Sequence, residues 1–113
     1  MKILLIDGTI IGSKTAAILE QVKVYIEQLN SDLDLEIMKL ADYDHQFVDG
    51  RPLGEYNEDM RRLFHQFEQA DGYVLATPIF QGSIPDVLKN TFDLLHPRTL
   101  SYKPVSIVAN GGT

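Results

Sequence analysis

The residues best suited to ligand chemistry lie in three turns rather than in one catalytic cluster. The first turn, residues 8–15, reads Gly-Thr-Ile-Ile-Gly-Ser-Lys-Thr and follows a short apolar run at residues 3–6. Its glycines, hydroxyl side chains and lysine stand where a helix is expected to begin, and free N–H groups at the positive end of a helix dipole favour an anion. The turn therefore predicts a phosphate site, with a plain glycine turn and helix cap as the alternative interpretation.

This first turn matches neither of two familiar phosphate motifs. Three residues separate Gly8 from Gly12, and Ser13 stands between Gly12 and Lys14, so the spacing of a Walker A loop is absent. No second glycine stands two residues after Gly8, so the Gly-x-Gly-x-x-Gly pattern of dinucleotide-binding folds is absent as well. We therefore expect neither an ATPase-type loop nor an ordinary dinucleotide site.

Two further turns follow later apolar runs. Residues 77–85 read Thr-Pro-Ile-Phe-Gln-Gly-Ser-Ile-Pro, and residues 110–113 read Asn-Gly-Gly-Thr. In the first of these, Ile79 and Phe80 could flank a flat ring while Gly82 lets the backbone approach it closely. A rigid loop whose Phe80 simply covers the core is the alternative. If the preceding runs form neighbouring parallel strands, all three turns converge at one edge of the sheet.

Composition narrows the possible chemistry further. A length of 113 residues with 44% hydrophobic content predicts one domain with one core, residues 1–113. The net charge of -6 disfavours binding to nucleic acids and to anionic membranes. The absence of cysteine excludes disulfides and thiolate chemistry, and three scattered histidines do not predict a metal site. No leader peptide or membrane helix is recognised, so we expect a cytoplasmic protein.

The elements that must position these turns alternate along the chain. Apolar runs predict strands near residues 3–6, 33–38, 73–76 and 105–109. Helical spacing between them predicts three amphipathic helices with these buried stripes: Ile18, Val22, Tyr25, Ile26 and Leu29; Met60, Leu63, Phe64 and Phe67 after an Asn57 cap; and Ile84, Val87, Leu88, Thr91, Phe92 and Leu95 after an opening at residues 83–85. This order predicts an α/β fold with an open, doubly wound parallel sheet, and residues 41–56 form a long acidic loop.

The turn at residues 77–85, continued by Val87-Leu88-Lys89-Asn90 and an Asp-Leu-Leu ending at Leu95, closely resembles the NADPH-dependent FMN reductase family of flavodoxin-like proteins. The turn at residues 8–15, Ala70-Asp71-Gly72 and Lys103-Pro104-Val105 also match, so the resemblance covers nearly the whole chain. It implies strand order 2-1-3-4. Family members continue into a further helix, a fifth strand and a closing helix, so we expect residues 1–113 to lack a C-terminal βα unit.

The resemblance also implies the cofactors and their contacts. FMN would be held at its phosphate by Thr9, Gly12, Ser13, Lys14 and Thr15, along its ribityl chain and ring by Pro78, Ile79, Phe80, Gln81, Gly82 and Ser83, and at its ring by Asn110, Gly111 and Gly112. Many relatives carry arginine where Ile11 stands, and Lys14 is its expected substitute. NADPH would supply hydride, and no protein side chain is expected to act as a catalyst because the flavin carries the chemistry.

The resemblance therefore predicts an oxidoreductase that reduces free flavin, a quinone or an azo compound, assembled as a homodimer or homotetramer. One alternative is a flavodoxin-type FMN electron carrier without NADPH oxidation of its own. Flavodoxins use a Thr-x-Thr-Gly-x-Thr turn and sandwich the ring between Trp or Tyr side chains, whereas this chain has no Trp. A second alternative is a cofactor-free flavodoxin-like protein that binds partners through residues 42–59.

Overall fold

The computed structural model describes residues 1–113 except 10–13, 48, 80–85, 96–98, 100–102 and 112–113. Its strands are β1 (Lys2–Asp7), β2 (Asp34–Lys39), β3 (Gly72–Ile79) and β4 (Val105–Gly111). Its helices are α1 (Lys14–Leu29), α2 (Glu58–Gln69) and α3 (Asp86–Leu94), with short 3-10 turns at Leu40–Asp42 and Leu53–Glu55. The predicted alternation of strands and helices is therefore confirmed, and the long loop contains two short helical turns.

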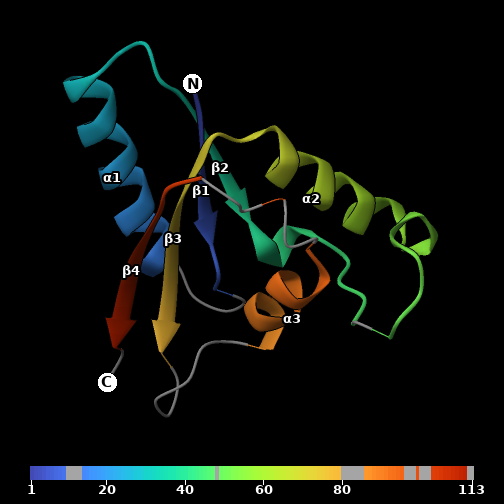
Figure 1. The fold of residues 1–113 in the computed structure, drawn as a ribbon. Coiled ribbons are helices and arrows are strands. Elements are labelled where there is room, and N and C mark those ends of the chain that lie inside the picture. Colours follow the sequence, from blue (N-terminus) through green and yellow to red (C-terminus); the bar gives the residue numbers. More distant parts are fainter. Residues whose placement is uncertain (10–13, 48, 80–85, 96–98, 100–102, 112–113) are drawn as a thin grey trace.

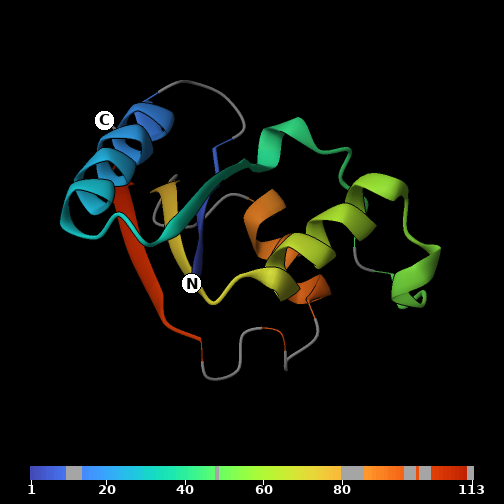
Figure 2. The same ribbon diagram turned by 90° about the horizontal axis from the view of Figure 1, so that it is seen from above.

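The four strands form one parallel sheet in the order β2-β1-β3-β4. Helix α1 covers one face of this sheet, and α2 and α3 cover the other, as Figures 1 and 2 show. This arrangement is the predicted doubly wound α/β fold with the predicted strand order. No helix within the described ranges is long and apolar enough to cross a membrane.

The face under α2 and α3 carries the larger core. Phe67 of α2 is completely buried, stacks on Tyr73 of β3 at 5.4 Å between ring centroids, and meets Phe92 of α3 edge-on at 6.3 Å. The predicted stripe of α2 is buried throughout, and Asn57 caps the helix by accepting a hydrogen bond from the N–H of Met60 at 2.8 Å. For α3 the structure confirms burial of Thr91 and Leu95 and half-burial of Phe92, while residues 83–85 lie outside the described part.

The face under α1 has a smaller core, and here one prediction was wrong. Leu19 is completely buried against Leu5 and Ala76, whereas Tyr25 is 62% exposed and Leu29 is 68% exposed. The buried stripe runs through Thr15, Leu19, Val22 and Ile26, which repeats with the same steps of three and four as the predicted stripe. Val22 and Ile26 belong to the predicted stripe as well, so the prediction was wrong in including Tyr25 and Leu29 and in omitting Leu19. Periodicity alone could not exclude Tyr25 and Leu29, because their spacing is also helical.

Two motifs that carry the family resemblance, Ala70-Asp71-Gly72 and Lys103-Pro104-Val105, hold parts of the fold together. Asp71 exchanges hydrogen bonds with Lys2, from Lys2 N–H to the Asp71 carboxylate at 2.8 Å and from Asp71 N–H to the Lys2 carbonyl at 2.7 Å. A Cβ at Gly72 would lie 3.0 Å from Ile3 Cδ1 and 3.2 Å from Pro104 Cγ. Asp71 and Gly72 therefore join the start of β3 closely to the strands on either side of it.

The Lys103 ammonium caps the C-terminus of α2. It donates to the Glu68 carbonyl at 3.1 Å and lies 3.4 Å from the Tyr73 hydroxyl, which itself donates to the Phe67 carbonyl. Cations suit this position because the last carbonyls of a helix are unpaired and carry partial negative charge. Burial raises the pKa of Tyr73 to about 12, so its hydroxyl stays a donor at neutral pH.

Candidate functional site

The candidate site lies beyond the carboxyl ends of β1, β3 and β4. Strand β1 connects through α1 to β2 on one side, and the chain then returns through α2 to β3 on the other side of β1. The strand order therefore reverses between β1 and β3, which is where open α/β sheets bind their ligands. The three predicted turns follow these strands, whose arrowheads point the same way in Figure 1.

The start of the first turn is fixed by the backbone of β3 and by an aspartate. Gly8 N–H donates to the Ala76 carbonyl at 2.9 Å, and Thr9 N–H donates to Asp7 Oδ1 at 2.9 Å. An aspartate that accepts from the N–H two residues further on forms an Asx turn, which bends the chain as it leaves the strand. Asp7 itself is only 4% exposed.

Thr9 supplies the observation that points most directly to a ligand at this turn. Its side chain is 7% exposed, and its Oγ1 is buried without a hydrogen-bond partner among the residues that the structure describes. Leaving a buried hydroxyl unpaired costs roughly 1–3 kcal/mol, so such atoms are rare in native proteins. A phosphate oxygen would satisfy this donor, so the residues present fit the phosphate of FMN.

The beginning of α1 completes the described part of the phosphate turn. Lys14 is the first residue of α1 and Thr15 the second, and the Thr15 side chain is 3% exposed. The first N–H groups of a helix lack partners within the helix and carry partial positive charge. The predicted contacts Gly12 and Ser13 lie outside the described residues.

The second turn begins later than predicted. Thr77, Pro78 and Ile79 were predicted to belong to a turn after a strand ending at Ala76, but they form the last three residues of β3. The proline is tolerated because β1 pairs with β3 only as far as Ala76, whose carbonyl already accepts from Gly8 N–H. Phe80, Gln81, Gly82 and Ser83 lie outside the described residues.

The third turn is displaced in the same way. Asn110 and Gly111 were predicted to be turn residues, but they belong to β4 and pair with Pro78 and Ile79. The extended strand β3 holds them in the sheet. The local preference of an Asn-Gly pair for turns does not take such a neighbour into account. Gly112 lies outside the described residues.

Strands β3 and β4 extend further than β1, so the edge of the sheet at the candidate site has a step. The last pair between β1 and β3 is Asp7 with Ala76, whereas β3 and β4 continue together to Ile79 and Gly111. Three residues of strand correspond to about 10 Å. The phosphate turn therefore leaves the sheet at a lower level than the two turns predicted to contact the ribityl chain and ring.

Asp7 is the site residue that sequence reasoning missed. It was given no role from the sequence, yet it is buried and shapes the turn. The available signal was local: an aspartate directly followed by Gly8 and Thr9 is typical of an Asx turn.

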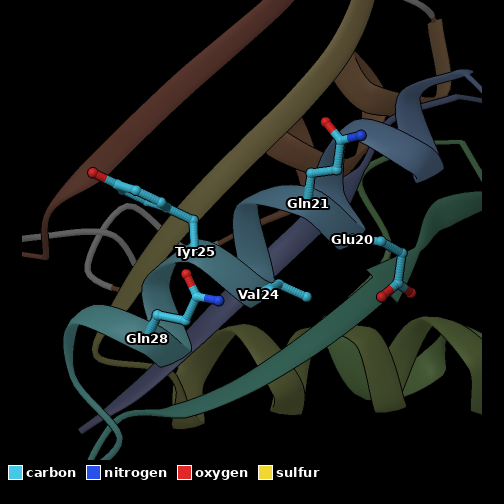
Figure 3. Close-up of a pocket in the computed structure, with 5 residues that line it drawn as sticks. All are labelled: Glu20, Gln21, Val24, Tyr25 and Gln28. Carbon is cyan, nitrogen blue, oxygen red and sulfur yellow. The ribbon is translucent and has the colours of Figure 1, made fainter.

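Two shallow grooves formed by described residues lie away from this site. One lies on the outer surface of α1, where Figure 3 shows its five lining side chains, Glu20, Gln21, Val24, Tyr25 and Gln28. The other lies near the starts of β3 and β4 and is lined mainly by apolar residues that include Ile26, Leu33 and Pro104. Neither groove is formed by the predicted cofactor residues.

Comparison with known proteins identifies relatives of this chain. The family model described as NADPH-dependent FMN reductase matches residues 1–113. An NAD(P)H-dependent FAD/FMN reductase from Geobacillus thermodenitrificans is 46% identical over 113 residues, covering 100% of this chain and 61% of the relative. An FMN-dependent NADPH-azoreductase from Staphylococcus saprophyticus is 36% identical over 117 residues, covering 99% of this chain and 61% of the relative. The chain thus spans less than two thirds of either relative.

Solved structures show the same fold. An NADH:FMN oxidoreductase in its apo form matches with a TM-score of 0.78 and 27% identity, covering 99% of this chain and 59% of that chain. The azoreductase AzrA matches with a TM-score of 0.73 at 15% identity, covering 100% of this chain and 70% of that chain, and this likeness concerns the fold alone.

Proposed function

The chain belongs to the NADPH-dependent FMN reductase family, and from that premise we propose that it acts as an FMN-dependent oxidoreductase. The proposed reductant is NADPH, and the proposed acceptors are free flavin, a quinone or an azo compound. The observation that carries the proposal is the buried, unpartnered Oγ1 of Thr9, at the switch point of the sheet and beside the start of α1. The names of the relatives, which are reductases and azoreductases, favour an enzyme over an electron carrier.

In this proposal the protein binds and orients while the cofactor reacts. The chemistry that bound FMN would supply is hydride acceptance from NADPH and electron transfer to the acceptor. The Thr9 hydroxyl, the Thr15 hydroxyl and the first N–H groups of α1 would hold the phosphate. The higher level of the step would place the ribityl chain and ring against Pro78 to Ser83 and Asn110 to Gly112. No described side chain needs to move a proton in this scheme.

The assembly and setting belong to the same proposal. We propose a homodimer or homotetramer in the cytoplasm, where NADPH is available as a reductant. Several exposed apolar side chains on α1 and β4 support association with further polypeptide, namely Val24, Tyr25, Leu29, Val105 and Ile107. The expected additional βα unit stays a prediction; it would cover the outer side of β4, which is the last strand of the described sheet.

The direct test is a visible spectrum of the purified chain with FMN, before and after addition of NADPH under exclusion of oxygen. We expect FMN to bind and its absorbance to bleach when NADPH is added. A chain that takes up no FMN would overturn the proposal. If bound FMN is bleached by dithionite but not by NADPH, the protein is an electron carrier rather than a reductase.

Thr9→Val tests the observation on which the proposal rests. The change keeps the shape of the side chain and removes the hydroxyl, so FMN affinity should fall about ten- to a hundredfold, since a hydrogen bond to a charged group is worth roughly 1.5–3 kcal/mol. Riboflavin, which lacks the phosphate, should bind as before. Thr99→Val is the matched control, because Thr99 is also buried but its carbonyl lies beside Tyr73 at the opposite end of the sheet. Equal effects of both variants on FMN binding would contradict the assignment.

A further inference from the structure

A buried carboxylate in a predicted phosphate site requires an explanation. Asp7 is 4% exposed and ends β1, and its Oδ1 accepts the hydrogen bond from Thr9 N–H at 2.9 Å. None of the ion pairs among the described residues includes Asp7. The negative charge therefore lies two residues from the buried Thr9 hydroxyl, the same hydroxyl that we assign to a phosphate oxygen.

The two interactions of this turn oppose each other when an anion binds. The hydrogen bond from Thr9 N–H to Asp7 fixes the backbone that carries the Thr9 hydroxyl, which favours binding by holding the turn in one shape. A negative charge on the same carboxylate would repel a phosphate, and water would screen this repulsion little because the side chain is buried. Asparagine offers the same oxygen acceptor without the charge, so the shape of the turn alone does not require aspartate.

We propose that Asp7 is a positioning residue that also sets the lifetime of the flavin complex: it shapes the phosphate turn, and its charge keeps bound FMN exchangeable. This inference rests on the proposed function. An exchangeable flavin suits a reductase that treats free flavin as a substrate, because the site must release reduced flavin and accept a new molecule. A permanently bound cofactor would gain nothing from the opposing charge.

Two substitutions at Asp7 separate the two effects. Asp7→Asn keeps the acceptor for Thr9 N–H and removes the charge, so it should bind FMN about tenfold more tightly than the natural chain, mainly through slower release. Asp7→Ala removes both, so it should bind FMN about tenfold more weakly than Asp7→Asn, from which it differs only by the lost acceptor. Asp34→Asn is the control, since it changes the net charge equally at an exposed residue at the start of β2.

The measurement is the dissociation constant and release rate of FMN, and separately of riboflavin, by quenching of flavin fluorescence in the full chain. The charge effect should appear with FMN and be absent with riboflavin, and a purely structural role of Asp7 would change both ligands alike. Unchanged FMN affinity in Asp7→Asn, or equal affinities in Asp7→Asn and Asp7→Ala, would overturn the inference while leaving the proposed function intact. A natural chain that binds no FMN would instead overturn the proposed function.

Discussion

The two faces of the sheet are packed very differently. Within the described part of the chain, the cluster under α2 and α3 contains fourteen buried side chains, whereas the cluster under α1 contains three. The predicted cofactor turn leads directly into α1, the helix on the sparsely packed face. The difference teaches that one face supplies most of the folding free energy while the other carries the binding element. Four substitutions test this division, from the largest expected effect to the smallest.

Phe67→Ala should cause the largest loss of stability. Phe67 is completely buried between Tyr73 and Phe92, so its removal should lower the free energy of unfolding by about 3–5 kcal/mol. Urea denaturation followed by circular dichroism measures this loss. Phe47→Ala is the matched control, because Phe47 is 61% exposed and its removal should change stability by less than about 0.5 kcal/mol. Similar losses for the two variants would contradict the placement of the core.

Leu19→Ala should cause a smaller loss on the opposite face. Leu19 is completely buried, but Val22 and Ile26 beside it are only partly buried and can adjust to the gap. We expect a loss of about 2–3 kcal/mol together with weaker FMN binding, because α1 would be held less firmly. Leu29→Ala, on the same helix at 68% exposure, should leave both quantities unchanged. A loss equal to that of Phe67→Ala would remove the distinction between the faces.

Gly72→Ala tests whether the α1 face is loosely packed along its whole length. Gly72 lies opposite Ile3 in the register, and an added Cβ would meet both Ile3 and Pro104. The Ile3 side chain can yield, but the proline ring cannot, so we expect a loss of about 1–2 kcal/mol. Gly54→Ala should cost far less, since nothing lies within 4 Å of a Cβ there. A neutral effect at Gly72 would show that the sparse packing extends to the starts of the strands.

Glu36→Gln should have the smallest effect, and one that depends on pH. A hydrogen bond from Lys2 lowers the pKa of Glu36 below 4.5, aided by Gln66 of α2, and the Lys2 and Glu36 charges lie 2.9 Å apart. A lowered pKa in the folded state means that this contribution is present above pH 4.5 and is lost as the pH falls through the folded value. Both side chains are about one third exposed, so the gain is small.

The measurement for Glu36→Gln is the urea midpoint as a function of pH. The natural chain should lose slightly more stability than the variant when the pH falls from neutral to well below 4.5. Glu20→Gln, at an exposed position of α1, is the control and should follow the natural chain. Parallel pH profiles for the natural chain and Glu36→Gln would show that the Lys2–Glu36 pair contributes nothing to stability.

The sequence predicted the order of strands and helices well, but it predicted the buried face of α1 and the ends of β3 and β4 less well. The fold could be predicted because apolar runs alternate with helical spacings, and because the turn at residues 77–85 resembles a known family. The stripe predicted for α1 correctly includes Val22 and Ile26 but adds the exposed Tyr25 and Leu29, since these satisfy the same spacing as the buried side chains. Which of these side chains are buried depends on the side of α1 that packs on the sheet, and this is a property of the tertiary structure.

The ends of the strands were missed for a related reason. Pro78 and Asn110 are turn formers by local preference, yet both are held in strands because β3 and β4 pair beyond the end of β1. Asp7 was not singled out, although an aspartate directly followed by Gly8 and Thr9 is typical of an Asx turn. For Pro78 and Asn110 the missing information was a neighbour distant in the sequence, whereas the signal for Asp7 was local.

The position of β1 has a consequence for the order in which the protein can be made. Strand β1 precedes both of its partners in the sequence yet lies between β2 and β3 in the sheet, and its hydrogen bonds to Asp71 join residues separated by 69 positions. Until the ribosome has added β3, the completely buried side chains of Leu4, Leu5 and Ile6 lack the neighbours that β3 provides. The nascent chain must therefore shield this apolar segment, by β2 and α1 or by a chaperone, until β3 has been added.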